Sequence, residues 1–421
     1  MISAPSSASR SGSRFDLPVN LTAISFSYLR ARPLATALNL LLLALGIATI
    51  TVLLLATSQL EERMGRDARG IDLVAGAKGS PMQLVLSSVF HIDAPAGNIP
   101  LADALALAKN RMVKKAIPLA LGDSYRGFRI AGTNHDYPAH YDARISQGRL
   151  WGTPLEAVLG ADVAAASGLA VGATFSGAHG LEGAGDMHES SPYKVVGMLA
   201  PSGSVMDRLV LTSVESVWAV HRHGEPGEDP AKLIADMEEE EKELTALLIQ
   251  YSTPLAAAML PRQVNATATL QAASPAYESA RLFSMIGVGV DVLRAFGFVL
   301  VLAAGLSVFI ALLNALEDRR YDLAVMRMLG AGRGRLMSLM LIEGAALSLA
   351  GGVAGIALGH LLTEILGRAL GQAKQAAVTG WAWDAREGWL LGLALLVGLA
   401  AALLPAWRAY RTDVAPVLAE G

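Results

Sequence analysis

The sequence has no cysteine among its 421 residues, and charged residues make up only 17% of it. The absence of cysteine excludes disulfides, thiolate metal sites and thiol nucleophiles. A soluble domain carries roughly 25% charged residues, so the deficit indicates apolar surface that meets lipid instead of water. The net charge of −3 gives no support for a nucleic-acid partner.

Catalytic motifs are missing as well. The chain contains no GxxxxGK[ST] loop for nucleotide phosphates, no GxSxG nucleophile turn and no HExxH zinc motif. We therefore expect no catalytic residues, no enzymatic activity and no cofactor of its own in this chain.

Four apolar segments are long enough to cross a bilayer, which requires about 20 residues in a helix. These segments are 34–56, 295–316, 337–362 and 389–406. The first is too long for a signal-peptide core of about 7–15 residues, so we expect an uncleaved anchor.

Basic residues predict the orientation of these spans. They gather in the N-terminal segment 1–33, in the loop 317–336 and in the tail 407–421. Short loops rich in Lys and Arg lie in the cytoplasm, which places the region 57–294 and the short loop 363–388 outside. We expect a multi-pass protein of the bacterial inner (cytoplasmic) membrane, with both termini cytoplasmic and the large domain periplasmic.

The region between the first two spans mixes two patterns. Short β-branched runs, such as 194–199 and 209–212, alternate with alanine-rich helical stretches, such as 102–109. Helical stalks are expected at both ends of this region, and a further helix over 231–248. The predicted fold class is an integral membrane protein with four transmembrane α-helices and a large α+β extracytoplasmic domain between helices 1 and 2.

Small residues crowd the third span. Gly351, Gly355 and Gly359 form a ladder at helical spacing, and such ladders let helices pack closely in lipid. The ladder has two interpretations, packing within the chain or a contact between two copies of it. Glu343 lies in the same span, where a carboxylate is costly; it is either functional or reaches the cytoplasmic interface.

Seven of the eight histidines lie in the outer region. His179 and His188 flank a glycine-rich loop that also holds acidic residues, and His221 and His223 would face one side of a strand. Imidazole and carboxylate ligands suit zinc, nickel or copper, so these four histidines are candidates for binding a divalent metal. The alternative is that they are ordinary solvated residues, because their spacing fits no closed tetrahedral site.

The loop 317–336 contains a short amphipathic helix. Leu323, Met326 and Leu329 recur every three residues, arginines occupy the remaining positions, and Gly330 is typical of a helix end. Such a helix either receives force from a cytoplasmic partner or lies on anionic lipid.

This loop also carries a family resemblance. Residues 319–331, RRYDLAVMRMLGA, and residues 341–344, LIEG, resemble the RR-x-E-I-x-x-x-R-x-L-G-A and L-x-E-G signature of the MacB/FtsX-like permeases. The stretch 405–418 is similar to the usual ending of that family. Asp322 stands where the family more often has Glu.

The resemblance implies a type VII ABC transporter permease. Two permease chains, forming a homodimer or a related heterodimer, would pair with two cytoplasmic ABC ATPase subunits that hold ATP and Mg²⁺. The helix between spans two and three would be the coupling helix on the ATPase. By the match, its residues are Arg319, Arg320, Asp322, Arg327, Leu329, Gly330 and Ala331.

Members of this family transmit ATPase-driven motion to a periplasmic domain that exports or extracts a substrate, in some cases with a periplasmic adaptor or substrate-binding protein. Lipoprotein, peptide or antibiotic, haem and metal are all compatible substrates. Two other functions stay open: an ABC-type regulator or scaffold of a periplasmic activity, and a module for divalent-metal transport or handling.

Overall fold

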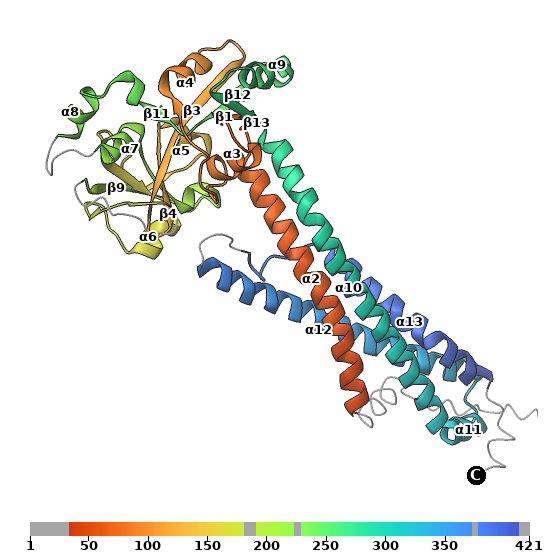
Figure 1. Cartoon of the computed structure of the whole chain (residues 1–421). Helices are drawn as coiled ribbons and strands as arrows, with labels where there is room; N and C mark the ends of the chain where they lie inside the picture. The colour runs from red at the N-terminus through yellow and green to blue at the C-terminus, as the bar shows by residue number, and fades with distance from the viewer. Residues whose placement is uncertain (1–32, 181–190, 223–228, 373–377, 412–421) are drawn as a thin grey trace, which may run out of the picture. The chain divides into compact units, whose positions relative to one another are not determined.

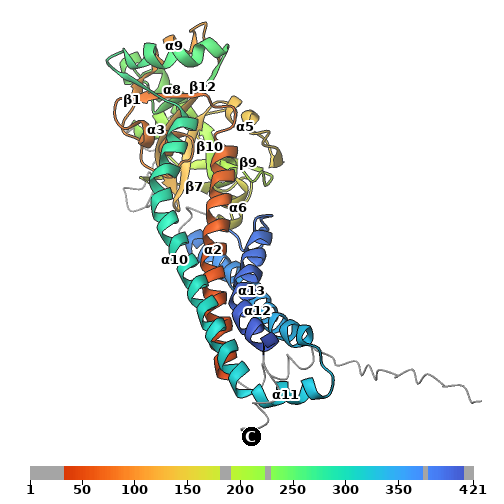
Figure 2. The same cartoon turned by 90° about the vertical axis from the view of Figure 1, so that its right-hand side faces the viewer.

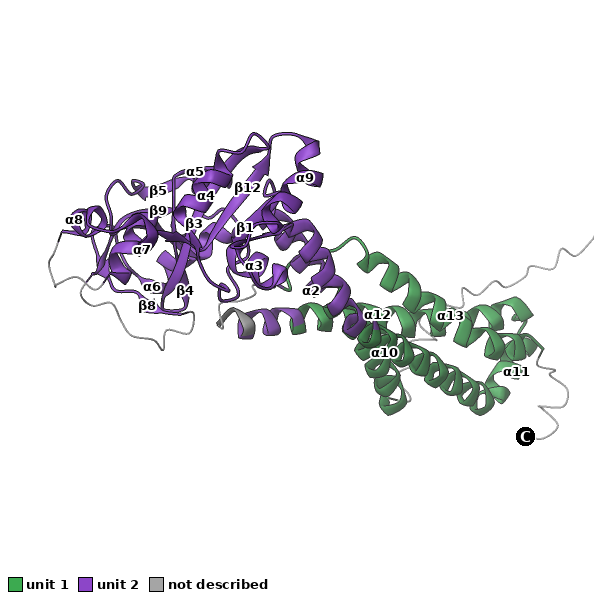
Figure 3. Ribbon diagram, turned by 45° about the horizontal axis from the view of Figure 1, so that its top comes forward, with its two compact units in different colours: residues 1–54, 292–362, 380–421 green, residues 55–291, 363–379 purple. Residues whose placement is uncertain are grey.

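The computed structural model describes residues 33–180, 191–222, 229–372 and 378–411, without the side chains of 370–372 (Figure 1). The chain divides into two compact units (Figure 3). Unit 1 comprises residues 1–54, 292–362 and 380–421, and unit 2 comprises residues 55–291 and 363–379.

Among the described residues, four helices are long and apolar enough to cross a membrane. They are α2 (Pro33–Asp67), α10 (Pro275–Asp318), α12 (Arg333–Gln372) and α13 (Glu387–Arg411). Each predicted span lies inside one of them, which confirms the prediction of four membrane helices. α2 and α10 are longer than the roughly 20 residues that a bilayer requires, because the flanking charged stretches continue the same helices.

Helix packing in unit 1 depends on glycines. The glycine ladder on α12 faces α2, and the contacts between the two helices repeat every four residues on each helix. The facing pairs are Gly351 with Leu43, Gly355 with Ile47, and Gly359 with Thr51. A Cβ atom at Gly355 would lie 2.7 Å from the Cβ of Ile47, closer than carbon atoms can approach, so the helix spacing requires glycine.

Unit 2 is an α+β domain, as predicted. Its helices are α3 (Pro81–Ser88), α4 (Leu101–Ala108), α5 (Asp136–His140), α6 (Ala161–Ser167), α7 (Val214–His221), α8 (Pro230–Ala235) and α9 (Pro254–Asn265), with 3₁₀ turns η1 (Val205–Arg208) and η2 (Glu239–Glu241). Its strands are β1 (Leu73–Ala77), β2 (Ile99–Pro100), β3 (Val113–Tyr125), β4 (Phe128–Thr133), β5 (Ile145–Gly148), β6 (Glu156–Leu159), β7 (Thr174–Phe175), β8 (Ala178–His179), β9 (Tyr193–Leu199), β10 (Leu209–Ser213), β11 (Glu243–Leu244), β12 (Ala246–Tyr251) and β13 (Leu270–Ala273).

The strands of the described chain form one large mixed sheet and a two-stranded ladder of β11 and β2. The main order is β13-β1-β12-β3-β4-β10-β6-β9-β5, with β8 on β3 and β7 on β9. α7 packs on β3, β4 and β10, while α9 packs on β13. Apolar side chains on the strands pack with these helices into buried clusters that form the core of unit 2.

The prediction of one helix over 231–248 is wrong. The helix α8 ends at Ala235, and Ala246 begins the strand β12. β12 lies between β1 and β3, and its first four residues are almost fully buried. Burial on both faces of a central strand favours a continuous apolar run, so tertiary packing overrides the helical propensity of this segment.

Candidate functional site

The helix α11 (Arg320–Met328) joins α10 to α12 (Figure 2). Its inner face is formed by Leu323 and Ala324, which are fully buried. Leu323 packs with Leu316 of α10, Leu336 of α12 and Ala406 of α13. α11 is therefore a rigid part of unit 1 and not a loosely held connection.

The C-terminal end of α11 is a Schellman motif. Gly330 has φ of +98° and donates its backbone N–H to the carbonyl of Arg327 at 3.1 Å. Ala331 donates its N–H to the carbonyl of Met326 at 3.0 Å. A left-handed residue at this position favours glycine, so the Leu-Gly-Ala sequence sets the angle at which the chain leaves α11.

The opposite side of α11 presents apolar residues to the surroundings. Tyr321, Val325, Met328 and Leu329 are 55%, 36%, 68% and 84% exposed. Arg320 and Asp322 are exposed beside them. We refer to these six residues as the α11 surface. A contiguous apolar surface with charged neighbours is typical of a protein–protein contact.

The structure places Arg319 apart from the other predicted coupling residues. Its guanidinium Nη1 lies 3.4 Å from Oε2 of Glu343 on α12, and both side chains are at least nine-tenths buried. Arg319 therefore anchors the start of α11 to α12 instead of contributing to the α11 surface. Both Glu343 and Arg319 were singled out from the sequence, but their pairing was not, because it arises only where α11 and α12 pack together.

Two of the four candidate metal histidines come together in unit 2. His179 is on β8, and its ring centroid is 5.1 Å from that of His221. The expectation that His221 lies in a strand is wrong, because His221 ends the helix α7. Between the two rings lies the carboxylate of Asp123 on β3, with Oδ1 3.2 Å from Nδ1 of His179 and 3.5 Å from Nε2 of His221. We refer to these three residues as the His-Asp-His cluster. His188 and His223 lie outside the described residues.

Sequence reasoning missed Asp123, and the reason is visible in the strand pairing. On β3, Leu121 pairs with Ala131 and Ser124 pairs with Arg129, so two residues of β3 face one residue of β4. Such a bulge redirects side chains, and here it includes Asp123. β8 pairs with β3 at this bulge, where Asp123 and His179 are direct antiparallel partners. No local sequence pattern predicts this bulge.

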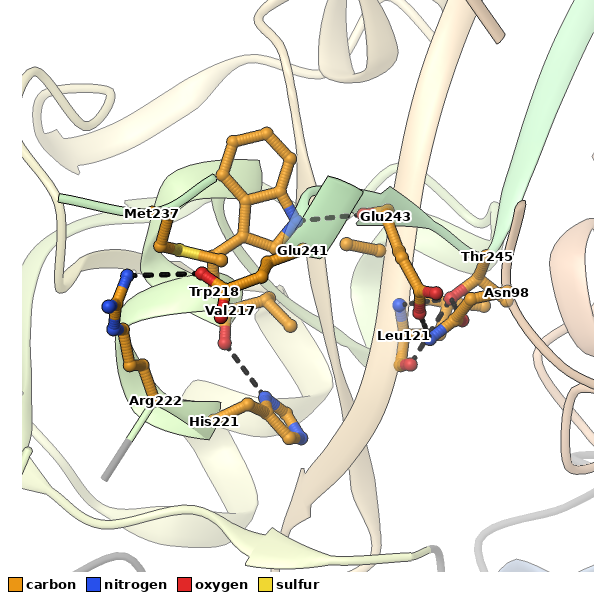
Figure 4. A pocket seen from close by; sticks show the side chains of 11 residues that line it. Asn98, Leu121, Val217, Trp218, His221, Arg222, Met237, Glu241, Glu243 and Thr245 are labelled. Atoms are coloured by element: carbon orange, nitrogen blue, oxygen red, sulfur yellow. Dashed lines mark hydrogen bonds and ion pairs between the residues drawn. The ribbon is translucent and has the colours of Figure 1, made fainter. Parts of the chain in front are cut away.

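His221 also lines a cavity of about 370 Å³ (Figure 4). Trp218 closes one side and donates its Nε1–H to the carbonyl of Glu243 at 2.7 Å. Arg222 and Glu241 form an ion pair of 3.2 Å on the same side as His221. The cavity therefore lies between α7 and the segment before β12. Its lining contains both positively and negatively charged side chains.

Comparisons with known proteins match both units. The model of the MacB-like periplasmic core domain matches residues 36–267, more than half of the chain. The model of the FtsX-like permease C-terminal region matches residues 294–414.

Individual relatives are more distant. The chain is 24% identical over 403 residues to PvdT of Pseudomonas aeruginosa, a pyoverdine export ATP-binding/permease protein, and the match covers 91% of this chain and 56% of PvdT. It is 30% identical over 116 residues to YknZ of Bacillus subtilis, an uncharacterized ABC transporter permease, covering 27% of each. The periplasmic region of MacB from Actinobacillus actinomycetemcomitans aligns with 52% of this chain and 95% of its own length, at 11% identity and a TM-score of 0.33. The chain thus spans about half the length of PvdT and about a quarter of YknZ.

Proposed function

This chain belongs to the MacB/FtsX-like family of ABC transporter permeases, and we propose that it transmits the motion of an ATPase partner through the membrane to its periplasmic domain. ATP and Mg²⁺ bind in the partner, and two permease chains act with two ATPase subunits. The result is export or extraction of a substrate from the periplasmic side. The export named for PvdT is consistent with this direction of transport.

The observation that carries the proposal is the construction of α11. Its inner face packs against three membrane helices, whereas the α11 surface is exposed and accessible to a partner. A force applied to that surface reaches α10 and α12 directly, because Leu323 is buried and the Arg319–Glu343 ion pair ties the helix start to α12.

The membrane orientation is tested first. The natural chain has no cysteine, so single-cysteine variants label without background. In intact cells with a permeable outer membrane, a membrane-impermeant maleimide should label Leu255→Cys on α9 and leave Leu329→Cys unlabelled until the inner membrane is opened. The reverse pattern would overturn both the topology and the function.

The partner is tested by photo-crosslinking. A photoreactive amino acid at Met328, on the α11 surface, should capture a protein that carries a GxxxxGK[ST] nucleotide-binding loop. The same amino acid at Leu255, which is 63% exposed on α9, is the matched control and should not capture it. Equal capture at both positions, or none at Met328, would contradict the assignment of the α11 surface.

Coupling is tested with the captured ATPase. Leu329→Asp places a charge on the α11 surface and should abolish the effect of the permease on the rate of ATP hydrolysis, whereas Leu255→Asp should preserve it. Substrate movement in reconstituted vesicles then separates export from the regulation of a periplasmic activity, in which hydrolysis is coupled but nothing moves.

A further inference from the structure

We propose that the His-Asp-His cluster of Asp123, His179 and His221 binds a zinc ion in the periplasmic domain. This site is independent of the ATPase partner and of the α11 surface. It is formed by residues that lie within unit 2 and are described throughout.

The spacing of the ligand atoms fits zinc. One ligand atom from each residue lies within 4.8 Å of the other two. Zinc bonds of about 2.0–2.1 Å in a tetrahedron separate neighbouring ligand atoms by about 3.3 Å. The two distances from Oδ1 of Asp123, 3.2 Å to His179 and 3.5 Å to His221, lie on either side of that value.

The hydrogen bonding of His221 directs the correct nitrogen at the metal. Nδ1 of His221 lies 2.8 Å from the carbonyl oxygen of Val217, and a carbonyl only accepts, so Nδ1 carries the hydrogen. Nε2 therefore faces the carboxylate of Asp123 and is the nitrogen that would bind a metal. Zinc-bound histidines commonly donate their other N–H to a carbonyl in this manner.

The carboxylate of the cluster is buried. The side chain of Asp123 is only 2% exposed, whereas both histidines are partly exposed. A bound cation offsets part of the cost of holding a carboxylate away from water, so the position of Asp123 favours a divalent ion at the cluster.

The donor set is compatible with zinc and leaves the ion accessible. Two imidazole nitrogens with one carboxylate oxygen are ligands that zinc accepts, and three protein ligands leave a fourth position for water or another ligand. The side chains of His179 and His221 are 45% and 36% exposed, so the fourth position faces solvent. Gly122 leaves room for the ring of His221, since a Cβ there would lie 3.3 Å from Nε2.

The test is zinc titration of the full-length chain, purified in detergent and treated with a chelator. Calorimetry or competition with a chromophoric chelator should give one zinc ion per chain, and zinc should raise the unfolding temperature. Cobalt(II) should produce the visible absorption of a tetrahedral nitrogen and oxygen site. Asp123→Asn and His179→Gln should each weaken zinc binding at least tenfold, because each removes a ligand.

Two controls separate this site from other histidines. His140→Gln removes an imidazole of unit 2 whose Nε2 contacts the carbonyl of Arg69, and it should not change zinc binding. A variant with both His188→Gln and His223→Gln should also retain the high-affinity site. His179 is partly exposed, so His179→Gln is expected to fold even if Asp123→Asn does not.

Absence of saturable zinc binding by the natural chain would overturn the proposal. Zinc binding that survives His179→Gln but disappears in the double variant would overturn it equally, by placing the metal elsewhere. Either result would leave the proposed coupling function untouched.

Discussion

The α11 surface and the His-Asp-His cluster differ in how far apart their residues lie in the sequence. The α11 surface lies within the nine residues Tyr321–Leu329 and their neighbour Arg320, and helical periodicity alone groups them. The cluster draws on β3, β8 and α7, and its members span Asp123 to His221. A local site can be recognised from spacing, whereas a site built from several strands depends on register.

Each unit also buries a carboxylate, but with different partners. In unit 1, the buried Glu343 of α12 lies against Arg319 at the start of α11. In unit 2, the buried Asp123 of β3 lies between the imidazoles of His179 on β8 and His221 on α7. The pair in unit 1 therefore joins two helices, whereas the cluster in unit 2 joins two strands and a helix.

The largest effect is expected from breaking the ion pair in unit 1. Glu343→Gln removes the carboxylate that faces the buried guanidinium of Arg319, which should cost about 3 kcal/mol of stability. Thermal unfolding in detergent measures the loss, and hydrolysis by the ATPase partner should become uncoupled. Glu317→Gln, at an exposed acid of the same junction, is the control and should change neither quantity. Equal effects of the two substitutions would show that only net charge matters there.

A smaller effect is expected from the glycine ladder. Gly355→Ala places a methyl group against Ile47 of α2 and should destabilise unit 1 by about 1–3 kcal/mol through overpacking. Gly392→Ala on α13 meets no atom within 4 Å and should be neutral or slightly stabilising, because alanine favours helix. If both variants unfolded at the temperature of the natural chain, α2 and α12 would not pack as closely as the structure shows.

The smallest effect concerns pH and unit 2. His91 is buried, and its Nε2 lies 2.8 Å from the hydroxyl of Tyr137. Burial first, and the charge of Arg129 second, hold the pKa of His91 well below its ordinary value of 6.5. Above that value the ring is neutral in both the folded and unfolded states, so it contributes no pH dependence. Below that value His91 binds a proton in the unfolded chain but not in the folded chain. Stability therefore falls as pH falls.

His91→Asn should remove this dependence, because asparagine does not titrate and tolerates the positive φ of 55° at this position. Between pH 7.5 and 5.5 the natural chain should lose about 1.4 kcal/mol more stability than the variant. The measured quantity is the difference in unfolding temperature between the two pH values. An identical difference for both chains would mean that His91 is already charged in the folded protein.

Much of unit 1 was determined by the sequence alone. Apolar runs predict the four membrane helices, because a bilayer imposes both their length and their internal hydrogen bonding. The helix that ends at Gly330 follows from three-residue periodicity and a glycine stop, both of which act within a few residues. The motif in 319–331 and the order of the elements were enough to identify the family.

The tertiary structure decided what depends on contacts between distant segments. It placed residues 246–248, the end of the helix expected over 231–248, in the strand β12, since neighbouring strands on both sides satisfy its backbone. It moved Arg319 from the expected contact surface into an ion pair. It also joined Asp123 to His179 and His221 through a bulge and a strand register. Residue spacing along the chain does not predict such pairings, because they arise only when separate segments pack together.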